Sequence, residues 1–382
     1  MVKQKSWICF VLCILMALSM LIGCGKPAPA QTTAAPTAEP VFEGVHTVVY
    51  GEEAKEPVGI HTDLQISLLQ QSYEKPHKKL QGMAENSFPE PLTLDWSEWA
   101  KANGASSYTV TLKSADGLDD RTYTTSETTL AVSNLLLNAQ YTWTVNAGEP
   151  SAFHTADVTV RNLHVDGITN VRDLGGYRTT DGKVVKQGLL FRCGRLNQTR
   201  AEEPVVEITE EGARVMLDEL HIVTEIDLRR TDNNEVGAIT ASVLGDSVHY
   251  YCIPMQVGLS DETDALLFNA DALKELFTIL ADESNYPLCF HCDIGTDRTG
   301  MVAILVNGLC GVSESDLYYD YLFSNAGNIK GIRAFDKFSA MPYVQHILNA
   351  PGSTMQEKVR NCLIEIGIPE ADMDKVVAIL TK

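Results

Sequence analysis

A ten-residue stretch, HCDIGTDRTG, runs from His291 to Gly300 and limits the possible folds more than any other part of the sequence. An apolar run, residues 287–290, precedes it, and an apolar pattern with helical spacing, residues 301–309, follows it. The stretch is therefore predicted to join a buried strand to a helix through a tight loop. Backbone N–H groups of such a loop point at one place, where the helix dipole adds positive potential, so we expect an anion site.

Cys292 and Arg298 give the expected anion site a chemistry. The planar guanidinium of Arg298 suits phosphate oxygens, and the same positive field favours the thiolate form of Cys292. A thiolate aimed at a bound phosphoryl group is a nucleophile for phosphate-ester cleavage. Thr299 can donate its hydroxyl to the sulfur. These residues predict hydrolysis of phosphomonoesters through a phosphocysteine intermediate, and a cysteine that only fills the core is the alternative.

The order His, Cys, five residues, Arg, Thr resembles the signature loop of the cysteine-based protein tyrosine phosphatases. The loop also carries Asp297 directly before Arg298. This pattern, HCxxGxDRTG, resembles more narrowly a bacterial tyrosine phosphatase family whose members act on phosphoproteins and sometimes on phosphoinositides. Three further blocks resemble motifs of that family in the same order: NVRDLGGY at residues 170–177, LFRCGRL at residues 190–196, and DLR at residues 227–229 with Glu235. The resemblance covers roughly residues 158–382 and implies an α/β domain with a central, mostly parallel sheet flanked by helices.

The resemblance also implies site residues. The expected catalytic residues are Cys292, Arg298, Asp297, Asp227 and Thr299, and the expected substrate-binding residues are Asp293, Ile294, Gly295, Thr296, Arg172 and Arg195. His291 is expected to orient the loop. Asp173, Arg192 and Arg229 belong to motifs expected near the mouth of the site, where the arginines would supply positive potential to a chain that is otherwise acidic.

The proton donor for the leaving group is either Asp297 or Asp227. Asp297 lies within the loop. Asp227 follows a predicted strand at the end where active-site residues of open α/β sheets gather, but it could instead hold Arg298 through an ion pair. We assign Asp297 as the acid and Asp227 as the residue that orients Arg298, with the reverse assignment left open.

Thr296 bears on the substrate class. Many relatives carry Lys at this position, which suits multiply phosphorylated lipid headgroups, so Thr296 favours phosphotyrosine or another monoester. An inositol phosphate or phosphoinositide phosphatase is the alternative, and a phosphate-binding or adhesive surface protein without turnover is the alternative from another class. No metal cofactor is implied, because the loop itself supplies the charge. The net charge of −20 excludes nucleic acid as a partner, so the expected partner is a phosphorylated protein or a small phosphomonoester.

Residues 1–23 are predicted to be a lipoprotein signal peptide. Two lysines precede an apolar run, residues 7–22, and the sequence LIGC that ends at Cys24 resembles a bacterial lipobox. We therefore expect Cys24 to be lipidated and the protein to be displayed on the outer face of a bacterial membrane. A retained membrane anchor is the alternative, although 16 residues are few for a bilayer span of about 20. Residues 24–44, rich in Ala, Pro and Thr, are predicted to be a flexible linker.

Residues 45–157 are predicted to form an all-β unit. Short runs that alternate apolar and polar residues are separated by clusters of Gly, Asp and Asn, which is typical of an antiparallel β-sandwich. Trp96 in an early strand and Tyr141 in a late one resemble a fibronectin type III domain, which implies a spacer or binding module. Residues 158–382 instead alternate strand-like and helix-like segments and are predicted to be the catalytic α/β unit.

Six cysteines follow Cys24, and their scattered spacing indicates no disulfide framework. Cys289 and Cys292 do form a C-x-x-C pattern. A regulatory disulfide between them is therefore left open, beside the simpler interpretation that Cys289 is a small apolar residue of a buried strand.

Overall fold

The computed structural model describes residues 44–75, 84–199, 205–231, 235–236, 239–257 and 263–382. The predicted signal peptide, the lipidation site Cys24 and nearly all of the predicted linker 24–44 lie outside these residues. Within the described ranges, no helix combines the length and the apolar character needed to cross a bilayer. Residues 41–382 belong to one compact unit. The boundary predicted between residues 157 and 158 therefore lies inside this unit and does not divide it.

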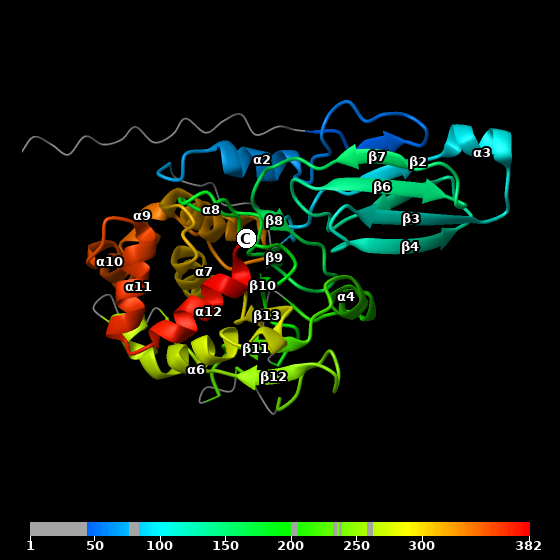
Figure 1. The fold of residues 1–382 in the computed structure, drawn as a ribbon. Helices are drawn as coiled ribbons and strands as arrows, with labels where there is room; N and C mark the ends of the chain where they lie inside the picture. The colour runs from blue at the N-terminus through cyan, green and yellow to red at the C-terminus, as the bar shows by residue number, and fades with distance from the viewer. Residues whose placement is uncertain (1–43, 76–83, 200–204, 232–234, 237–238, 258–262) are drawn as a thin grey trace, which may run out of the picture. The chain divides into compact units, whose positions relative to one another are not determined.

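Two sheets form the N-terminal part of this unit (Figure 1). One has the order β1-β2-β5, with β1 (Thr47–Val49), β2 (Leu92–Asp95) and β5 (Thr129–Val132). The other has the order β4-β3-β6-β7, with β3 (Tyr108–Ser114), β4 (Asp120–Thr125), β6 (Gln140–Val145) and β7 (Ser151–His154), all antiparallel. Their alternating residues supply a shared apolar core that includes Trp96, Tyr141 and Trp143. The predicted alternation is therefore present, while the specific likeness to a fibronectin type III domain stays a prediction.

Two helices interrupt the part of the chain predicted to be all β. Helix α2 (Asp63–Gln70) begins with a capping box, in which Thr62 and Gln65 bond each other's backbone N–H groups. It packs against α8 (Glu314–Phe323) of the C-terminal part. Helix α3 (Ser97–Asn103) directly follows β2. Residues 45–157 are thus not purely β, because residues 63–70 and 97–103 are helical.

A six-stranded sheet with the order β12-β11-β13-β10-β9-β8 forms the centre of the C-terminal part. Its strands are β8 (Arg161–Asn162), β9 (Arg172–Asp173), β10 (Leu190–Cys193), β11 (Thr224–Asp227), β12 (His249–Cys252) and β13 (Leu288–His291). The four strands β12, β11, β13 and β10 are parallel, and β9 and β8 add antiparallel edges. The mostly parallel sheet expected from the sequence is present.

Helices surround this sheet and form two apolar cores with it, one that includes residues 215–220 and one that the later helices share (Figure 1). They are α4 (Glu210–Arg214), which continues as a π-helix over Val215–Glu219, α5 (Ala265–Phe268), α6 (Ala270–Leu280), α7 (Asp297–Leu309), α8, α9 (Phe335–Ser339), α10 (Pro342–Asn349), α11 (Met355–Glu365) and α12 (Glu370–Leu380). Helix α6 buries Leu273, Leu276 and Phe277 at the predicted helical spacing. Helix α7 is buried along almost its whole length because it packs against β13, α8 and α11.

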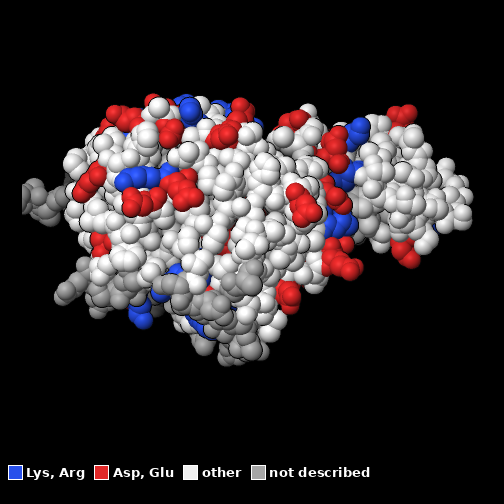
Figure 2. Space-filling model, turned by 90° about the horizontal axis from the view of Figure 1, so that it is seen from below, with Lys and Arg blue, Asp and Glu red and all other residues white. Residues whose placement is uncertain are grey.

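Charged side chains are dispersed on the face shown in Figure 2, where small groups of Lys and Arg alternate with Asp and Glu. Among the described residues on this face there is no continuous basic strip.

Candidate active site

The predicted strand, loop and helix are β13, residues 292–296 and α7. Strands β11, β12 and β13 end level, because Asp227 pairs in register with both Cys252 and His291. The segments that follow these three strands therefore meet at one edge of the sheet, where ligands of open parallel sheets bind. They line a cavity of about 460 Å³ formed by Arg230, Glu235, Met255, Gln256, Val257, Cys292, Asp293, Ile294, Asp297 and Arg298.

The carbonyl groups of the loop are bonded on the side away from the cavity. Arg192 donates to the carbonyl of Gly295 at 2.7 Å, and Asn170 donates to the same oxygen at 2.9 Å. Gly295 has φ +67°, and a Cβ there would lie 2.5 Å from the backbone of Cys193, so only glycine fits. Since the C=O and N–H of a peptide point in opposite directions, this arrangement directs loop N–H groups towards the cavity.

Cys292 lies at the base of the cavity and is only 2% exposed. Burial alone raises the pKa of its thiol, but the charge of Arg298 and the hydroxyl and N–H of Thr299 outweigh burial, so the pKa is lowered. The Thr299 hydroxyl is buried and has no other hydrogen-bond partner among the described residues. It is therefore available to stabilise a thiolate.

Arg298 is held by Glu235 and not by Asp227. The Arg298 guanidinium donates to Glu235 Oε2 at 2.6 Å, and its pKa is raised because the Cys292 and Glu235 charges outweigh burial. The Asp227 carboxylate is fully buried and accepts hydrogen bonds from Arg229 and Tyr250. The expected pairing of Asp227 with Arg298 is thus corrected, because Arg229 lies two residues away and occupies that carboxylate first.

Asp297 is the candidate acid that lines the cavity, whereas Asp227 does not line it. Arg333 donates to both carboxylate oxygens of Asp297, at 3.0 and 2.9 Å, and the Tyr321 hydroxyl donates at 3.1 Å. Burial alone raises the pKa of Asp227, but the charges of His291 and Arg229 outweigh burial, so the pKa is lowered. Arg333 was not found from the sequence, because it lies in an irregular segment that carries no motif.

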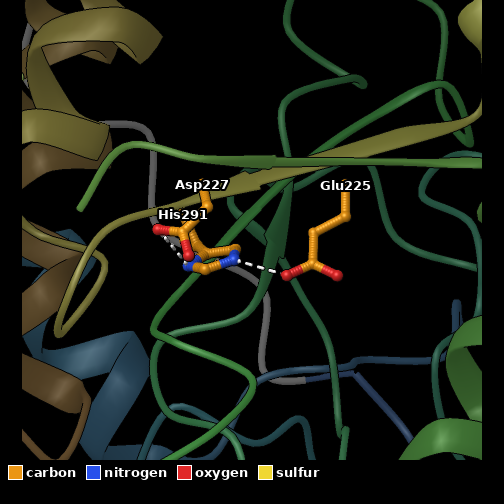
Figure 3. Close-up of side chains that lie close together, drawn as sticks. All are labelled: Glu225, Asp227 and His291. Atoms are coloured by element: carbon orange, nitrogen blue, oxygen red, sulfur yellow. Dashed lines mark hydrogen bonds and ion pairs between the residues drawn. The ribbon is translucent and has the colours of Figure 1, made fainter. Parts of the chain in front are cut away.

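His291, Glu225 and Asp227 form a buried cluster beneath the loop (Figure 3). The His291 ring lies 2.9 Å from Glu225 Oε1 and 3.8 Å from Asp227 Oδ1, and its Nδ1 lies 3.2 Å from the Cys292 carbonyl. Burial lowers the pKa of His291, but the two carboxylates outweigh it and raise the pKa to about 9. A ring protonated on both nitrogens donates to Glu225 and to the Cys292 carbonyl at the start of the loop. The orienting role of His291 stays a prediction.

The arginines expected near the mouth of the active-site cavity are buried and do not line the cavity. Arg172 and Arg192 have no exposed surface, and both pair with Asp320. Arg229 pairs with Asp227 as described above, and Asp173 pairs with Arg161. Arg172 therefore does not reach the cavity, because its strand faces the interior. A guanidinium can be buried there only beside a carboxylate.

Three expected substrate-binding residues of the loop differ in position. Asp293 and Ile294 line the cavity, and Arg195 donates to the Asp293 carboxylate at 2.6 Å. Thr296 is fully buried, and its hydroxyl lies 3.3 Å from the Ile294 carbonyl, so its side chain faces away from the substrate. The Thr296 hydroxyl therefore bonds within the loop, and a contact between the Thr296 backbone N–H and the substrate stays a prediction. Cys289 is fully buried, and a hydrogen bond with Cys193, together with burial, raises the pKa of its thiol.

Residues 163–367, which contain this loop and all the cavity residues, match the family described as the tyrosine phosphatase family over more than half of the chain. The chain belongs to the tyrosine phosphatase family. It is 28% identical over 196 residues to a Cupriavidus necator protein named as a candidate tyrosine-protein phosphatase, which covers 47% of this chain and 69% of that protein. Membership and this relative identify the tyrosine phosphatase domain as a phosphatase, that is, a hydrolase.

Two solved structures are also similar to parts of this chain. One is the core catalytic domain of the PP-IP phosphatase SIW14 from S. cerevisiae in complex with citrate, with 15% identity, a TM-score of 0.26, and coverage of 40% of this chain and 80% of that one. The other is a Siw14 catalytic core, with 11% identity, the same TM-score, and coverage of 50% and 85%. At these TM-scores the likeness decides neither fold nor substrate.

Proposed function

We propose that the protein hydrolyses phosphomonoesters through a covalent phosphocysteine on Cys292, with phosphotyrosine as the preferred substrate. The observation that carries this proposal is the position of the Cys292 thiol. It lies at the base of an open cavity, between Arg298 and Thr299, and its pKa is lowered. A buried cysteine with only a core role would have a raised pKa and no cavity above it.

In the first chemical step, the Cys292 thiolate attacks phosphorus and the bond from phosphorus to the ester oxygen breaks. Asp297 gives a proton to the departing oxygen, while Arg298 and the loop N–H groups bind the remaining phosphoryl oxygens. In the second step, water attacks the phosphocysteine and loses a proton to Asp297. The S–P bond breaks, and the Thr299 hydroxyl stabilises the thiolate that is released.

The cavity wall supports a single phosphate on an aromatic group. Met255, Val257 and Ile294 supply an apolar side that suits a phenyl ring. Arg298 and Arg230 are the cations of the described lining, and three carboxylates, those of Glu235, Asp293 and Asp297, lie beside them. A ring with several phosphates would need more positive charge than this lining supplies, so an inositol phosphate is the less favoured substrate.

The test is a substrate panel on the purified chain. An aryl phosphate and phosphotyrosine peptides are expected to be hydrolysed at a rate that a metal chelator does not change. The kcat/KM for inositol polyphosphates is expected to be lower than that for phosphotyrosine peptides by about tenfold or more. A factor of this size corresponds to the loss of one well-matched ionic contact. Faster release of phosphate from the inositol polyphosphates would favour the alternative substrate class, and no hydrolysis of any ester would favour a protein that only binds phosphate.

We also propose display on the outer face of a bacterial membrane through a lipid on Cys24. The support for this proposal is the sequence LIGC that follows the apolar run of residues 7–22. Replacing Cys24 by Ala is expected to move the protein from the membrane fraction to the soluble fraction. Unchanged attachment to the membrane would contradict lipidation at this residue.

A further inference from the structure

The position of the phosphate-binding loop depends on Asn170. Its side-chain amide donates to the carbonyl of Gly295 at 2.9 Å and to that of Ile294 at 3.3 Å. Asn170 is fully buried, and its own amide oxygen accepts a hydrogen bond from Arg172. A shift of the Asn170 backbone would therefore move the amide that holds these two loop carbonyls.

Glu85, from the N-terminal part of the chain, bonds the backbone beside this amide. Its Oε1 accepts a hydrogen bond from the N–H of Asn170 at 3.4 Å, and its Oε2 accepts one from the N–H of Asn328 at 3.0 Å. The same Oε1 also accepts from the N–H of Ser87 at 3.3 Å and from the Ser87 hydroxyl. The two oxygens of one carboxylate thus join segments that are far apart in sequence. A carboxylate is the side chain suited to this, because both of its oxygens are acceptors.

The bond from Asn328 to Glu85 Oε2 connects Glu85 to the segment that holds Asp297, the candidate acid. Asn328 begins an irregular segment that ends near Arg333, whose guanidinium holds the Asp297 carboxylate. The neighbouring Gly327 lies against Asn170, since a Cβ on Gly327 would be 3.1 Å from the Asn170 Cβ. Glu85 therefore contacts both the segment that holds the loop carbonyls and the segment that holds Asp297.

The Glu85 segment is itself held in place by buried polar contacts. The side-chain amide of Gln65 in α2 donates to the carbonyls of Asn86 and Phe88, at 2.7 and 2.6 Å. The amide of Asn162 in β8 donates to the carbonyl of Ser87 at 2.7 Å. Gln65, Asn162 and Ser87 are all fully buried, so the segment is a fixed support for the Glu85 carboxylate.

We propose that Glu85 is a positioning residue for the phosphatase site, and that the N-terminal part of the chain therefore sets the catalytic rate of the domain that follows it. Glu85 lies outside residues 163–367, which match the tyrosine phosphatase family. The family domain of this chain is thus completed by a residue from a different part of the molecule. This inference rests on the proposed function of Cys292 and Asp297.

The test compares Glu85→Gln with Glu90→Gln in the full chain. An amide keeps the size of the Glu85 side chain but offers one oxygen acceptor. Either the N–H of Asn328, or the donors of Ser87 and Asn170 that share the other oxygen, therefore lose their bonds. Glu90 lies on the same segment, and the substitution makes the same change of charge. The readouts are kcat for an aryl phosphate per reactive Cys292 thiol, and the inhibition constant of inorganic phosphate.

We expect Glu85→Gln to lower kcat by about tenfold to a hundredfold, as for one charged hydrogen bond, and to weaken phosphate inhibition severalfold. We expect Glu90→Gln to change neither. A purely structural role would reduce the number of reactive thiols but leave the phosphate inhibition constant of the remaining molecules unchanged, and that result would overturn the proposal. So would wild-type values of kcat and phosphate inhibition in Glu85→Gln. A wild-type chain without phosphatase activity would instead overturn the proposed function.

Discussion

Replacing Cys292 by Ser is expected to lower kcat for an aryl phosphate by about a thousandfold or more, because a serine hydroxyl is not ionised near neutral pH. The features that stabilise the thiolate, the charge of Arg298 and the hydroxyl of Thr299, cannot ionise a group with so high a pKa. The fold is expected to remain, since Ser and Cys differ little in size. Steady-state hydrolysis and thermal unfolding of the two proteins are the measurements.

Cys252→Ser is the matched control for this prediction. Cys252 is half-buried at the end of β12, level with Asp227, but it is not among the residues of the cavity, and burial raises the pKa of its thiol. Its replacement is expected to leave kcat unchanged. The alkylation rate of Cys292 by iodoacetamide is expected to reach half of its maximum at a pH below the ordinary thiol value of about 8.5. Equal activity of Cys292→Ser and wild type, or a midpoint above that value, would contradict a thiolate nucleophile.

The sequence predicts the part of the site whose residues are close together in the chain. The strand that ends at His291, the loop and the start of α7 follow from a continuous pattern of apolar residues, glycines and one cap region. Within this stretch Cys292, Asp297 and Arg298 all line one cavity. Their catalytic roles stay predictions until the variants are measured.

Contacts between distant segments could not be predicted in the same way. Glu235 holds Arg298 and Arg333 holds Asp297, although each pair is separated by dozens of residues. The sequence offers several acidic residues for each arginine, and only the fold selects one. Glu85, which comes from outside the family domain, carries no motif at all.

The buried arginines were placed incorrectly for a physical reason. The resemblance implied that motif residues such as Arg172 and Arg192 lie near the mouth of the site, where they would supply positive potential. In the structure Asp320 compensates both of them, and the guanidinium of Arg192 also bonds the carbonyl of Gly295. These residues shape the loop from beneath, which a one-dimensional pattern does not distinguish from binding the substrate directly.

Replacing Asp297 by Asn is expected to lower kcat by about a hundredfold or more for phenyl phosphate, whose leaving group needs a proton. The loss is expected to be much smaller for a dinitrophenyl phosphate, whose leaving group departs as an anion. The rate of hydrolysis measured across a series of leaving groups is therefore expected to depend more steeply on leaving-group pKa in Asp297→Asn than in wild type. Asp227→Asn is the comparison, because Asp227 bonds Arg229 and Tyr250 instead of lining the cavity. It is expected to lower stability without making that dependence steeper, and the opposite pattern in the two variants would assign the acid to Asp227.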